Sequence, residues 1–288
     1  MEFIDFCPVC FSKNIDYSQA IVMPFVSDRT KTWLPMKIEK EEFNDLEKGY
    51  QYLTTNTCHC KECGLIYSRH RFNDYEMSLL YKNYRGEDYV KLRSKYEPSY
   101  KKTQAYLDLQ VQHLGQIETK VIEHLKNPPK NCSVLDFGGH DGLNSPFKNN
   151  SRQLIGYDIS MEDPFVTISG PRYNSKQKFN IVTCMHVFEH VSWPNQLVKE
   201  ISSYLDNDGL IYIEVPLDSF IDFNSGGLKE GCKKKHWHEH INSFSKKSIV
   251  HLFEENNFET LWVNILDVSD SFRKFEVIQF IGRKISRT

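Results

Sequence analysis

The sequence predicts an α/β fold, in which a mostly parallel sheet ends in an antiparallel strand and a small cysteine-rich module precedes the sheet. Two observations predict it. Apolar runs of strand length alternate with amphipathic helical segments from residue 131 onward, as in doubly wound parallel sheets. Five of the eight cysteines lie within the first 63 residues. We therefore expect a module over residues 1–72, a helical connector over 73–130 and an α/β domain over 131–288.

The composition is that of an ordinary globular protein. Of the 288 residues, 40% are hydrophobic and 26% are charged, and the formal net charge is −2. No overall positive charge favours nucleic acid, and no apolar stretch approaches the ~20 residues that a membrane span needs. The N-terminal segment has neither the basic nor the apolar region of a signal peptide. We therefore expect a cytoplasmic protein with no nucleic-acid partner and no membrane span.

Two Cys-x-x-Cys pairs stand in the first module, "CPVC" at 7–10 and "CKEC" at 60–63. Two such thiolates on a tight turn can both reach one tetrahedral zinc ion at ~2.3 Å, so two turns supply four ligands. The pattern predicts that Cys7, Cys10, Cys60 and Cys63 hold a structural zinc ion. Cys58 and His59 are neighbours that could replace a ligand. A redox pair, or reduced cysteines without a metal, are the alternatives.

Two helices are expected in the connector. Residues 74–84 follow an Asn/Asp start that suits a helix N-terminus. From about residue 98 to residue 126, apolar side chains recur every three or four residues, which is typical of a long amphipathic helix. The prolines of "NPPK" end it. The recurring apolar positions are Leu107, Val111, Leu114, Ile117, Val121 and Leu125.

The α/β domain is predicted element by element from its apolar runs. Buried strands are expected at 132–137, 152–158, 164–168, 179–184 and 210–216. Helices are expected to open at 143–147 and to cover 194–205 and 245–257, the last with Ser245 as N-cap. Residues 206–209, "DNDG", read as a turn. The runs at 258–266 and 274–282 are expected to close the sheet as an antiparallel pair.

A ligand site is expected where the first two of these strands end. In an open parallel sheet, ligands bind outside the carboxyl ends of the strands, and both "DFGGHDG" and "GYD" lie there. Glycines let the backbone approach a ligand closely. Asp158 follows Asp136 by 22 residues, which is the spacing of an acid that hydrogen-bonds a ribose diol. The pattern predicts an adenosine-type cofactor, although it is neither G-x-G-x-x-G nor a P-loop.

Several motifs together carry a family resemblance. The order and spacing of "VLDFGGHDG", "GYDIS", "HVFEHV", "LDNDGLIYIEVP" and "HINSFSKKSIVHLFEENNF" resemble class I S-adenosylmethionine-dependent methyltransferases. The N-terminal "CPVC…CKECGLIYS…LLYKNY" resembles the zinc-binding module of a bacterial subfamily. That subfamily includes sugar C-methyltransferases and enzymes of surface-polysaccharide clusters, such as those for capsule or lipopolysaccharide. The resemblance covers roughly residues 5–266 and implies a Rossmann-like sheet and S-adenosyl-L-methionine as cofactor.

The resemblance also implies which residues bind the cofactor. The family turn is Asp-x-Gly-x-Gly-x-Gly, and this sequence has histidine, His140, at the middle glycine. His140 is interpreted as a tolerated loop residue, with a contact to cofactor or substrate and a loss of cofactor affinity as alternatives. The residues expected to bind the cofactor are Asp136, Gly138, Gly139 and Gly142 around its amino-acid end, Asp158 on the ribose, and His186 beyond the fourth strand.

Histidines and glutamates cluster after the strands, in "HVFEH" at 186–190 and "HWHEH" at 236–240. Methyl transfer needs alignment, and a base if the acceptor must lose a proton. A stretch similar to "WHEHINSFS" carries a Tyr-x-Glu-His set in the active site of sugar C-methyltransferases, which implies catalytic roles for His240 and Glu239. We expect His240 to be the base, Glu239 to orient it, and His190 to be the second candidate. His236, His238 and His240 would share one face of a strand, so a metal site there is an alternative.

The predicted function is S-adenosylmethionine-dependent methylation of a small polar acceptor, such as a nucleotide-linked sugar or another surface-glycan precursor. The family tyrosine is Trp237 here, and the sequence ends at Thr288 without the long further domain of the C-methyltransferases. Both departures favour O- or N-methylation over C-methylation. A sugar C-methyltransferase, a non-catalytic binding protein with the same fold, and an RNA methyltransferase with a zinc ribbon are the alternatives.

Overall fold

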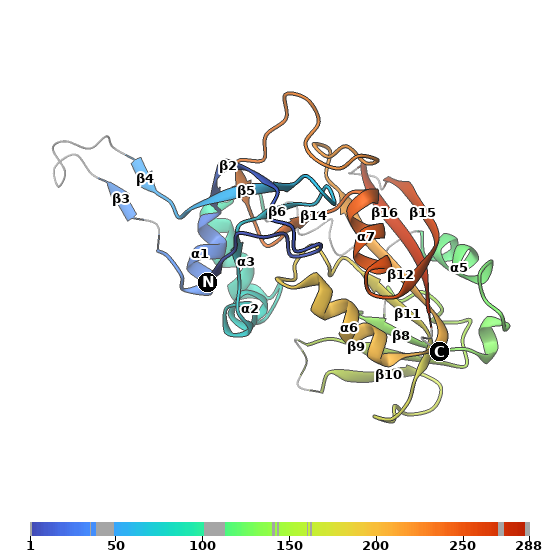
Figure 1. The fold of residues 1–288 in the computed structure, drawn as a ribbon. Helices are drawn as coiled ribbons and strands as arrows, with labels where there is room; N and C mark the ends of the chain where they lie inside the picture. Colours follow the sequence, from blue (N-terminus) through green and yellow to red (C-terminus); the bar gives the residue numbers. More distant parts are fainter. Residues whose placement is uncertain are drawn as a thin grey trace.

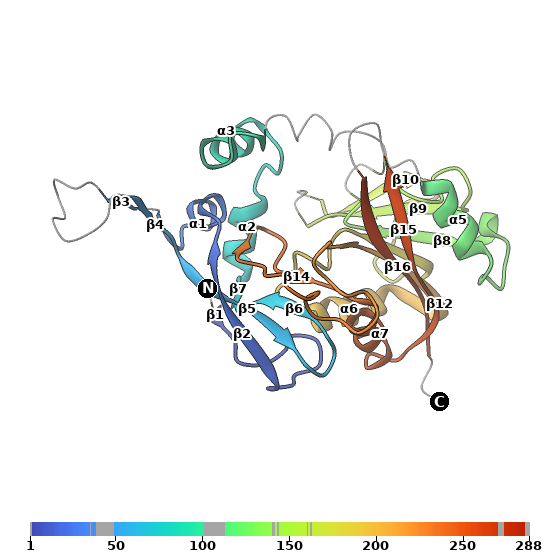
Figure 2. The same ribbon diagram turned by 90° about the horizontal axis from the view of Figure 1, so that it is seen from above.

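The computed structural model places the chain in two sheets that lie side by side, one built mainly from the N-terminal residues and one from residue 133 onward (Figures 1 and 2). It describes residues 2–34, 36–38, 49–100, 113–139, 142, 144–159, 161, 163–269 and 274–285.

The larger sheet has seven strands in the order β10-β9-β8-β11-β12-β16-β15. Its four central strands are parallel, and apolar runs buried on both faces form them. These are β9 (Gln153–Tyr157), β8 (Ser133–Phe137), β11 (Phe179–Met185) and β12 (Leu205–Leu217). Antiparallel strands flank them: β10 (Phe165–Ser169) on one edge, and β16 (Lys274–Lys284) with β15 (Phe258–Ser269) on the other. The predicted sheet with its antiparallel closing pair is confirmed.

Helices cover both faces of this sheet. On one face, α6 (Pro194–Tyr204) and α7 (Lys246–Glu254) pack Leu197, Ile201 and Phe253 into a core with β8 and β12. As predicted, α7 begins with Ser245, whose hydroxyl caps the Ser248 amide. On the other face, α5 (Leu114–Ile122) packs Ile117 and Val121 against the same strands. A short 3-10 turn, η1 (Pro129–Asn131), leads from α5 into β8.

Two predicted local structures are wrong. Residues 144–150 form turns and not a helix. The backbone of Phe147 is left-handed, with φ 64°, so that its ring can enter the core below the sheet, and this conformation interrupts a helix. The expected turn at 206–209 is instead the beginning of β12, where the pairing register with β11 shifts and Asp208 adopts φ 60°.

Part of the long predicted connector helix is present. Of the range 98–126, the described structure contains α5, and Leu107 and Val111 lie outside the described residues. The shorter predicted helix is α2 (Asp74–Tyr81), which Asn73 and Glu76 start with a capping box. It is followed by α3 (Glu87–Tyr96), which sequence periodicity did not indicate.

The smaller sheet draws strands from both halves of the chain, in the order β13-β2-β5-β6-β14. The N-terminal residues supply β2 (Ile15–Val22), β5 (Thr54–Cys60) and β6 (Ile66–Ser68), while β13 (His236–Trp237) and β14 (Asn242–Ser243) come from the segment after β12. Figure 1 shows β14 beside β6, although the two strands are far apart in sequence. The module predicted over residues 1–72 is therefore completed by residues 236–243.

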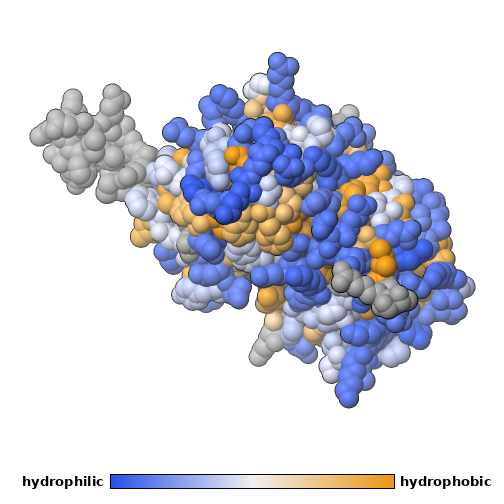
Figure 3. All heavy atoms as spheres, viewed as in Figure 1, coloured by the Kyte–Doolittle hydropathy of each residue, from blue (hydrophilic) through white to orange (hydrophobic). Residues whose placement is uncertain are grey.

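Smaller elements surround this sheet. They are α1 (Pro24–Thr30), the pair β1 (Glu2–Phe3) with β7 (His70–Arg71), and the hairpin of β3 (Met36–Ile38) with β4 (Gly49–Gln51). Hydrophilic residues cover most of the face drawn in Figure 3, with separate hydrophobic patches between them. Within the described ranges, no helix combines the length and apolarity that crossing a membrane requires.

Candidate active site and metal centre

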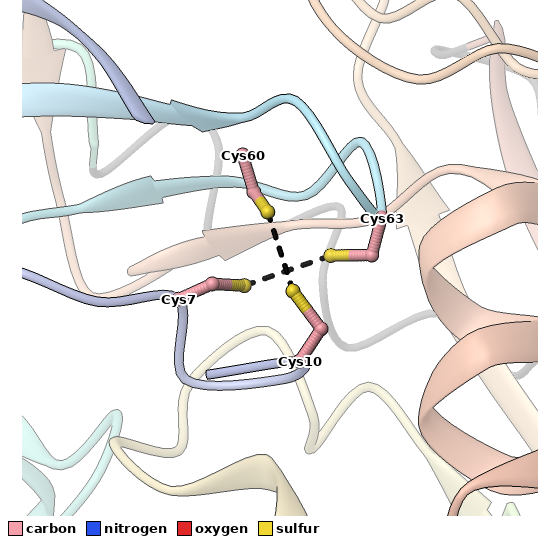
Figure 4. A group of neighbouring side chains, drawn as sticks. All are labelled: Cys7, Cys10, Cys60 and Cys63. Carbon is pink, nitrogen blue, oxygen red and sulfur yellow. Dashed lines mark hydrogen bonds between the residues drawn. The ribbon is translucent and has the colours of Figure 1, made fainter. Parts of the chain in front are cut away.

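Four cysteine sulfurs converge at the edge of the smaller sheet (Figure 4). Cys7 and Cys10 lie on the turn after β1, Cys60 ends β5, and Cys63 lies on the turn that follows. The Cys7 and Cys63 sulfurs are 3.6 Å apart, those of Cys10 and Cys60 are 3.3 Å apart, and all four lie within 4.8 Å of one another. The other two nearby candidates, Cys58 and His59, are outside this group.

These four residues fit a structural zinc ion. The set is all sulfur and closed, which is the composition of structural zinc sites. Burial raises the pKa of the Cys7 thiol, whereas hydrogen bonds from Cys63 and Cys7 lower the pKa of Cys10 to about 3. A divalent cation would stabilise all four as thiolates and tie the two turns together.

The predicted cofactor turn begins at a buried carboxylate. Asp136 is 1% exposed at the end of β8, where Thr183 Oγ1 donates a hydrogen bond to it at 2.8 Å and Ser145 Oγ donates a second. Burial raises the pKa of Asp136 to about 6, against the lowering effect of these two hydrogen bonds. The carboxylate therefore holds the turn from inside.

The glycines after Asp136 leave no room for side chains. A Cβ atom at Gly139 would lie 2.1 Å from Asp136 Oδ2, and one at Gly138, which has φ 85°, would lie 2.6 Å from the Val187 side chain. Gly142 has φ 72° and is similarly close to Ile168. The turn is therefore wrapped tightly around Asp136 and touches the loop after β11. His140 lies outside the described residues.

Asp158 lies beside this turn. The strands β8 and β9 are paired in parallel with Phe137 opposite Tyr157, and the Gly138 amide donates to the Tyr157 carbonyl at 2.7 Å. This pairing brings Asp158, the residue after Tyr157, next to the glycines, where a ribose-binding acid is expected.

His186, the remaining predicted cofactor residue, follows β11 with φ 55°. Its Nε2 lies 3.1 Å from Oε1 of Glu214, a fully buried carboxylate on β12. Glu214 also lies 2.9 Å from His113 Nε2 and accepts a hydrogen bond from Tyr212 at 2.7 Å. Burial alone would raise the pKa of Glu214, but the hydrogen bonds with the two histidines hold it below its usual range. Sequence reasoning missed this network, although a glutamate inside the apolar run "LIYIEVP" was a signal for it.

The loop after β11 is joined to the segment between β13 and β14. The Glu189 carbonyl accepts hydrogen bonds from the Ile241 and Asn242 amides, at 2.8 and 3.0 Å. This connection brings the predicted catalytic residues together. His190 Nδ1 lies 3.2 Å from the Glu239 carbonyl oxygen, and the His190 and His240 rings stand perpendicular with centroids 4.5 Å apart.

Glu189 joins this histidine pair and is itself 1% exposed. Its Oε1 lies 3.8 Å from His190 Nε2 and 3.5 Å from His186 Nδ1. Burial, together with the neighbouring His240, lowers the pKa of the His190 imidazole to about 4. The cluster of Glu189, His190, Glu239 and His240, called here the polar cluster, therefore combines neutral imidazole with buried carboxylate.

The connector adds two side chains that sequence reasoning missed. The Tyr81 hydroxyl, at the end of α2, lies 2.7 Å from His190 Nδ1. Arg93 on α3 donates to Glu239 Oε1 at 2.6 Å. Burial raises the pKa of Glu239, but Arg93 and the other positive groups nearby outweigh this effect and lower that pKa to about 2. Arg93 lies in no quoted motif, and Tyr81 lies in "LLYKNY" but was given no role there, because the positions of both depend on how the connector packs on the smaller sheet.

The alternating histidines do not form the alternative metal site. The rings of His236 and His238 are near each other, but the structure groups His240 with Glu189 and His190 instead. The strand on which the three would share a face, β13, is only two residues long, and His238 turns toward Glu97, with Nδ1 and Oε1 3.4 Å apart.

Comparisons with known proteins match this chain to methyltransferases. Residues 109–262 match the model of a family described as a methyltransferase domain. Among solved structures, a 1,6-didemethyltoxoflavin-N1-methyltransferase from Burkholderia thailandensis is similar, at 14% identity and a TM-score of 0.48, over 79% of this chain and 99% of that one. An S-adenosylmethionine-dependent methyltransferase from Methanosarcina mazei is similar at 12% identity and a TM-score of 0.42, over 62% of this chain and 100% of that one.

A glycopeptide N-methyltransferase is similar at 8% identity and a TM-score of 0.40, over 62% of this chain and 98% of that one. A search of curated proteins gives no match. The family match covers more than half of the chain and includes both the glycine turn and the polar cluster. The chain therefore belongs to the methyltransferase domain family and is a methyltransferase with the Rossmann-like class I fold.

Proposed function

We propose that this enzyme transfers the methyl group of S-adenosyl-L-methionine to a small polar acceptor bound at the polar cluster. The observation that carries the proposal is the contact between two sites. Gly138 of the cofactor turn packs against Val187, and Val187 belongs to the same loop as Glu189 and His190. A donor held at the turn and an acceptor held at the cluster would therefore meet.

The donor side is assigned to the turn and its neighbours. The turn of Gly138, Gly139 and Gly142 is assigned to the amino-acid end of the cofactor, Asp136 holds this turn, and Asp158 accepts hydrogen bonds from the ribose hydroxyls. His186 is assigned to the wall beside the methyl group. When bound, S-adenosylmethionine supplies an activated methyl group for in-line displacement.

The acceptor side is assigned to the polar cluster. Carboxylate oxygens and imidazole nitrogens can accept hydrogen bonds from hydroxyl or amine groups, so they suit an acceptor rich in such groups. A hydroxyl is a poor nucleophile while it keeps its proton, and proton removal in place typically contributes ~10²–10⁴-fold. We assign activation of the acceptor to His240 and His190, with Glu239, fixed by Arg93, orienting the acceptor.

The substrate class follows from this chemistry and from the cysteine module. A nucleotide-linked sugar or another surface-glycan precursor offers several hydroxyls, which favours O-methylation, or N-methylation of an amino sugar. We assign a structural zinc ion to Cys7, Cys10, Cys60 and Cys63, because the set is closed and leaves no position for a substrate.

A mass-spectrometric screen tests the proposal. Purified protein is incubated with S-adenosylmethionine and a panel of sugar nucleotides, and each is inspected for the mass gain of one methylene unit. We expect at least one product, formed together with S-adenosylhomocysteine. The same panel with Asp158→Ala protein controls for contaminating enzymes and should give much less product. Turnover of S-adenosylmethionine only on RNA, with no product in the panel, would contradict the assigned substrate class.

A further inference from the structure

Three side chains of the polar cluster form a group that the cysteine site does not explain. Ligand-type atoms of Glu189, His190 and His240 all lie within 4.8 Å of one another. Atoms bound to one cation at ~2.0–2.2 Å are at most ~4.4 Å apart, so small side-chain rotations would bring all three within coordination distance.

The Glu189 carboxylate is buried without a hydrogen bond. It is 1% exposed, and neither oxygen has a hydrogen-bond partner among the residues that the structure describes. The nearest imidazole nitrogens, of His186 and His190, stand 3.5 and 3.8 Å away, beyond ordinary hydrogen-bond length. A buried carboxylate left this way is costly unless a cation or donor completes it.

His190 is oriented as metal-binding histidines usually are. A carbonyl oxygen can only accept, so the tautomer with the ring proton on Nδ1 lets His190 donate to the Glu239 carbonyl at 3.2 Å. Nε2 then carries the lone pair on the side of Glu189. Ligating histidines typically donate their other ring nitrogen to a carbonyl or carboxylate in this way. The Tyr81 hydroxyl, 2.7 Å from the same Nδ1, further fixes the ring.

We propose that Glu189, His190 and His240 bind a divalent first-row transition-metal cation. Two imidazoles and one carboxylate, with positions left open, make up the ligand set of catalytic rather than structural metal sites. The inference rests on the proposed function, in which the polar cluster activates the acceptor. The bound cation would carry out this activation, and His190 and His240 would act as its ligands.

A cation at this position could activate the acceptor for methyl transfer without any further reactant. An acceptor hydroxyl on an open position of the cation becomes more acidic and loses its proton to water. The resulting oxygen forms a bond to the methyl carbon while the sulfur–carbon bond of the donor breaks. The sulfur keeps that electron pair in S-adenosylhomocysteine, and no oxidant or reductant is consumed.

Cobalt titration tests the site on the purified full chain, which keeps its cysteine-bound zinc. We expect one cobalt ion per chain to bind with weak visible absorption and without the strong near-ultraviolet absorption of cobalt thiolates, while the zinc content stays constant. His240→Ala and the nearly isosteric Glu189→Gln should each weaken this binding at least ~100-fold, since loss of even an outer partner of a metal ligand costs 10–100-fold. His238→Ala is the matched control on the same segment and should bind as the wild type does.

The outcomes separate the inference from the proposed function. Wild-type protein that contains only one metal ion per chain and binds no cobalt, or binds it only with thiolate absorption, overturns the metal site, and so do both variants binding cobalt like the wild type. Methyl transfer that proceeds without this cation contradicts the catalytic role of the metal and leaves the proposed function supported. A bound cation without methyl transfer to any acceptor supports the site and contradicts the proposed function. A second zinc ion already present in the purified protein, and absent from both variants, supports the proposal equally.

Discussion

Asp136 is the buried carboxylate of the proposed donor side, and its burial disfavours the charged form. Its carboxylate is buried under the glycine turn and accepts hydrogen bonds from the hydroxyls of Ser145 and Thr183, and no cation is paired with it among the residues that the structure describes. Burial raises its pKa to about 6, so the folded protein binds a proton there more tightly than the unfolded chain does. Stability from this residue is therefore greatest below the ordinary aspartate pKa and is lost as the pH rises through about 6.

Asp136→Asn should remove this pH dependence. An amide is neutral throughout and can still accept from one hydroxyl and donate to the other. In urea unfolding without cofactor, we expect the wild type to lose on the order of 1–3 kcal/mol of stability between about pH 5 and about pH 8 relative to the variant. Equal pH dependence in the two proteins would show that the carboxylate is not strained by burial.

Asp158→Ala should weaken cofactor binding by ~1–3 kcal/mol, because a charged acceptor for the ribose hydroxyls is lost. Isothermal titration calorimetry with S-adenosylhomocysteine measures it directly. Asp163→Ala is the control, since Asp163 is an exposed acid in the same loop whose carboxylate accepts from the Phe165 amide. If the two variants bind alike, the ribose assignment is wrong.

At the scale of elements, the smaller sheet holds the segment that carries Glu239 and His240. The strand β13 pairs with β2, and β14 pairs with β6. Thr57 on β5 binds this segment twice, by donating to the Lys234 carbonyl at 2.6 Å and by accepting from the Trp237 indole at 2.8 Å. Gly64, next to Cys63, lies so close to Gly226 that a Cβ atom on either would overlap the other backbone. We therefore expect the cysteine site to stabilise the segment that carries Glu239 and His240, one wall of the proposed acceptor site.

Cys60→Ser should accordingly loosen residues 236–243 as well as the N-terminal strands. A hard hydroxyl replaces a thiolate at the end of β5, which weakens zinc binding and the sheet that it ties together. Hydrogen–deuterium exchange should show lost protection in β2, β5 and 236–243, with β8 and β11 unchanged and cofactor affinity retained. Cys58→Ser is the control, since Cys58 is on the same strand but outside the metal group. Loss confined to residues 1–72 would mean that the two parts are independent.

Sequence patterns predicted those features of the fold and the site that depend on residues close together in sequence. The glycine turn, the two cysteine pairs and the buried strands each follow from residue types at short spacing. The wrong helix prediction and the site residues that were not predicted have a common cause, which is tertiary packing. Phe147 left a predicted helix to reach the core, and Tyr81 and Arg93 entered the site through the fold of the connector. Glu189 stood in a motif, but its lack of a hydrogen bond is visible only in three dimensions.

On the scale of the whole molecule, the site lies where two sheets meet. The larger sheet presents the glycine turn and the loop after β11, and the smaller sheet presents the segment between β13 and β14. Hydrogen bonds from Ile241 and Asn242 to the Glu189 carbonyl join the two parts. In the proposed function, the donor binds to the larger sheet and the acceptor mainly to the smaller one, so a substitution on the proposed acceptor side should leave the donor side intact.

The central claim is that the glycine turn and the polar cluster form one methyl-transfer site with separate donor and acceptor sides. The most direct measurement compares turnover and S-adenosylhomocysteine affinity for the wild type, His240→Ala and His238→Ala, using the acceptor found in the screen. We expect His240→Ala to lose at least ~10²-fold in kcat while its cofactor affinity stays near that of the wild type, and His238→Ala to keep both. Near-normal kcat in a folded His240→Ala protein would contradict it.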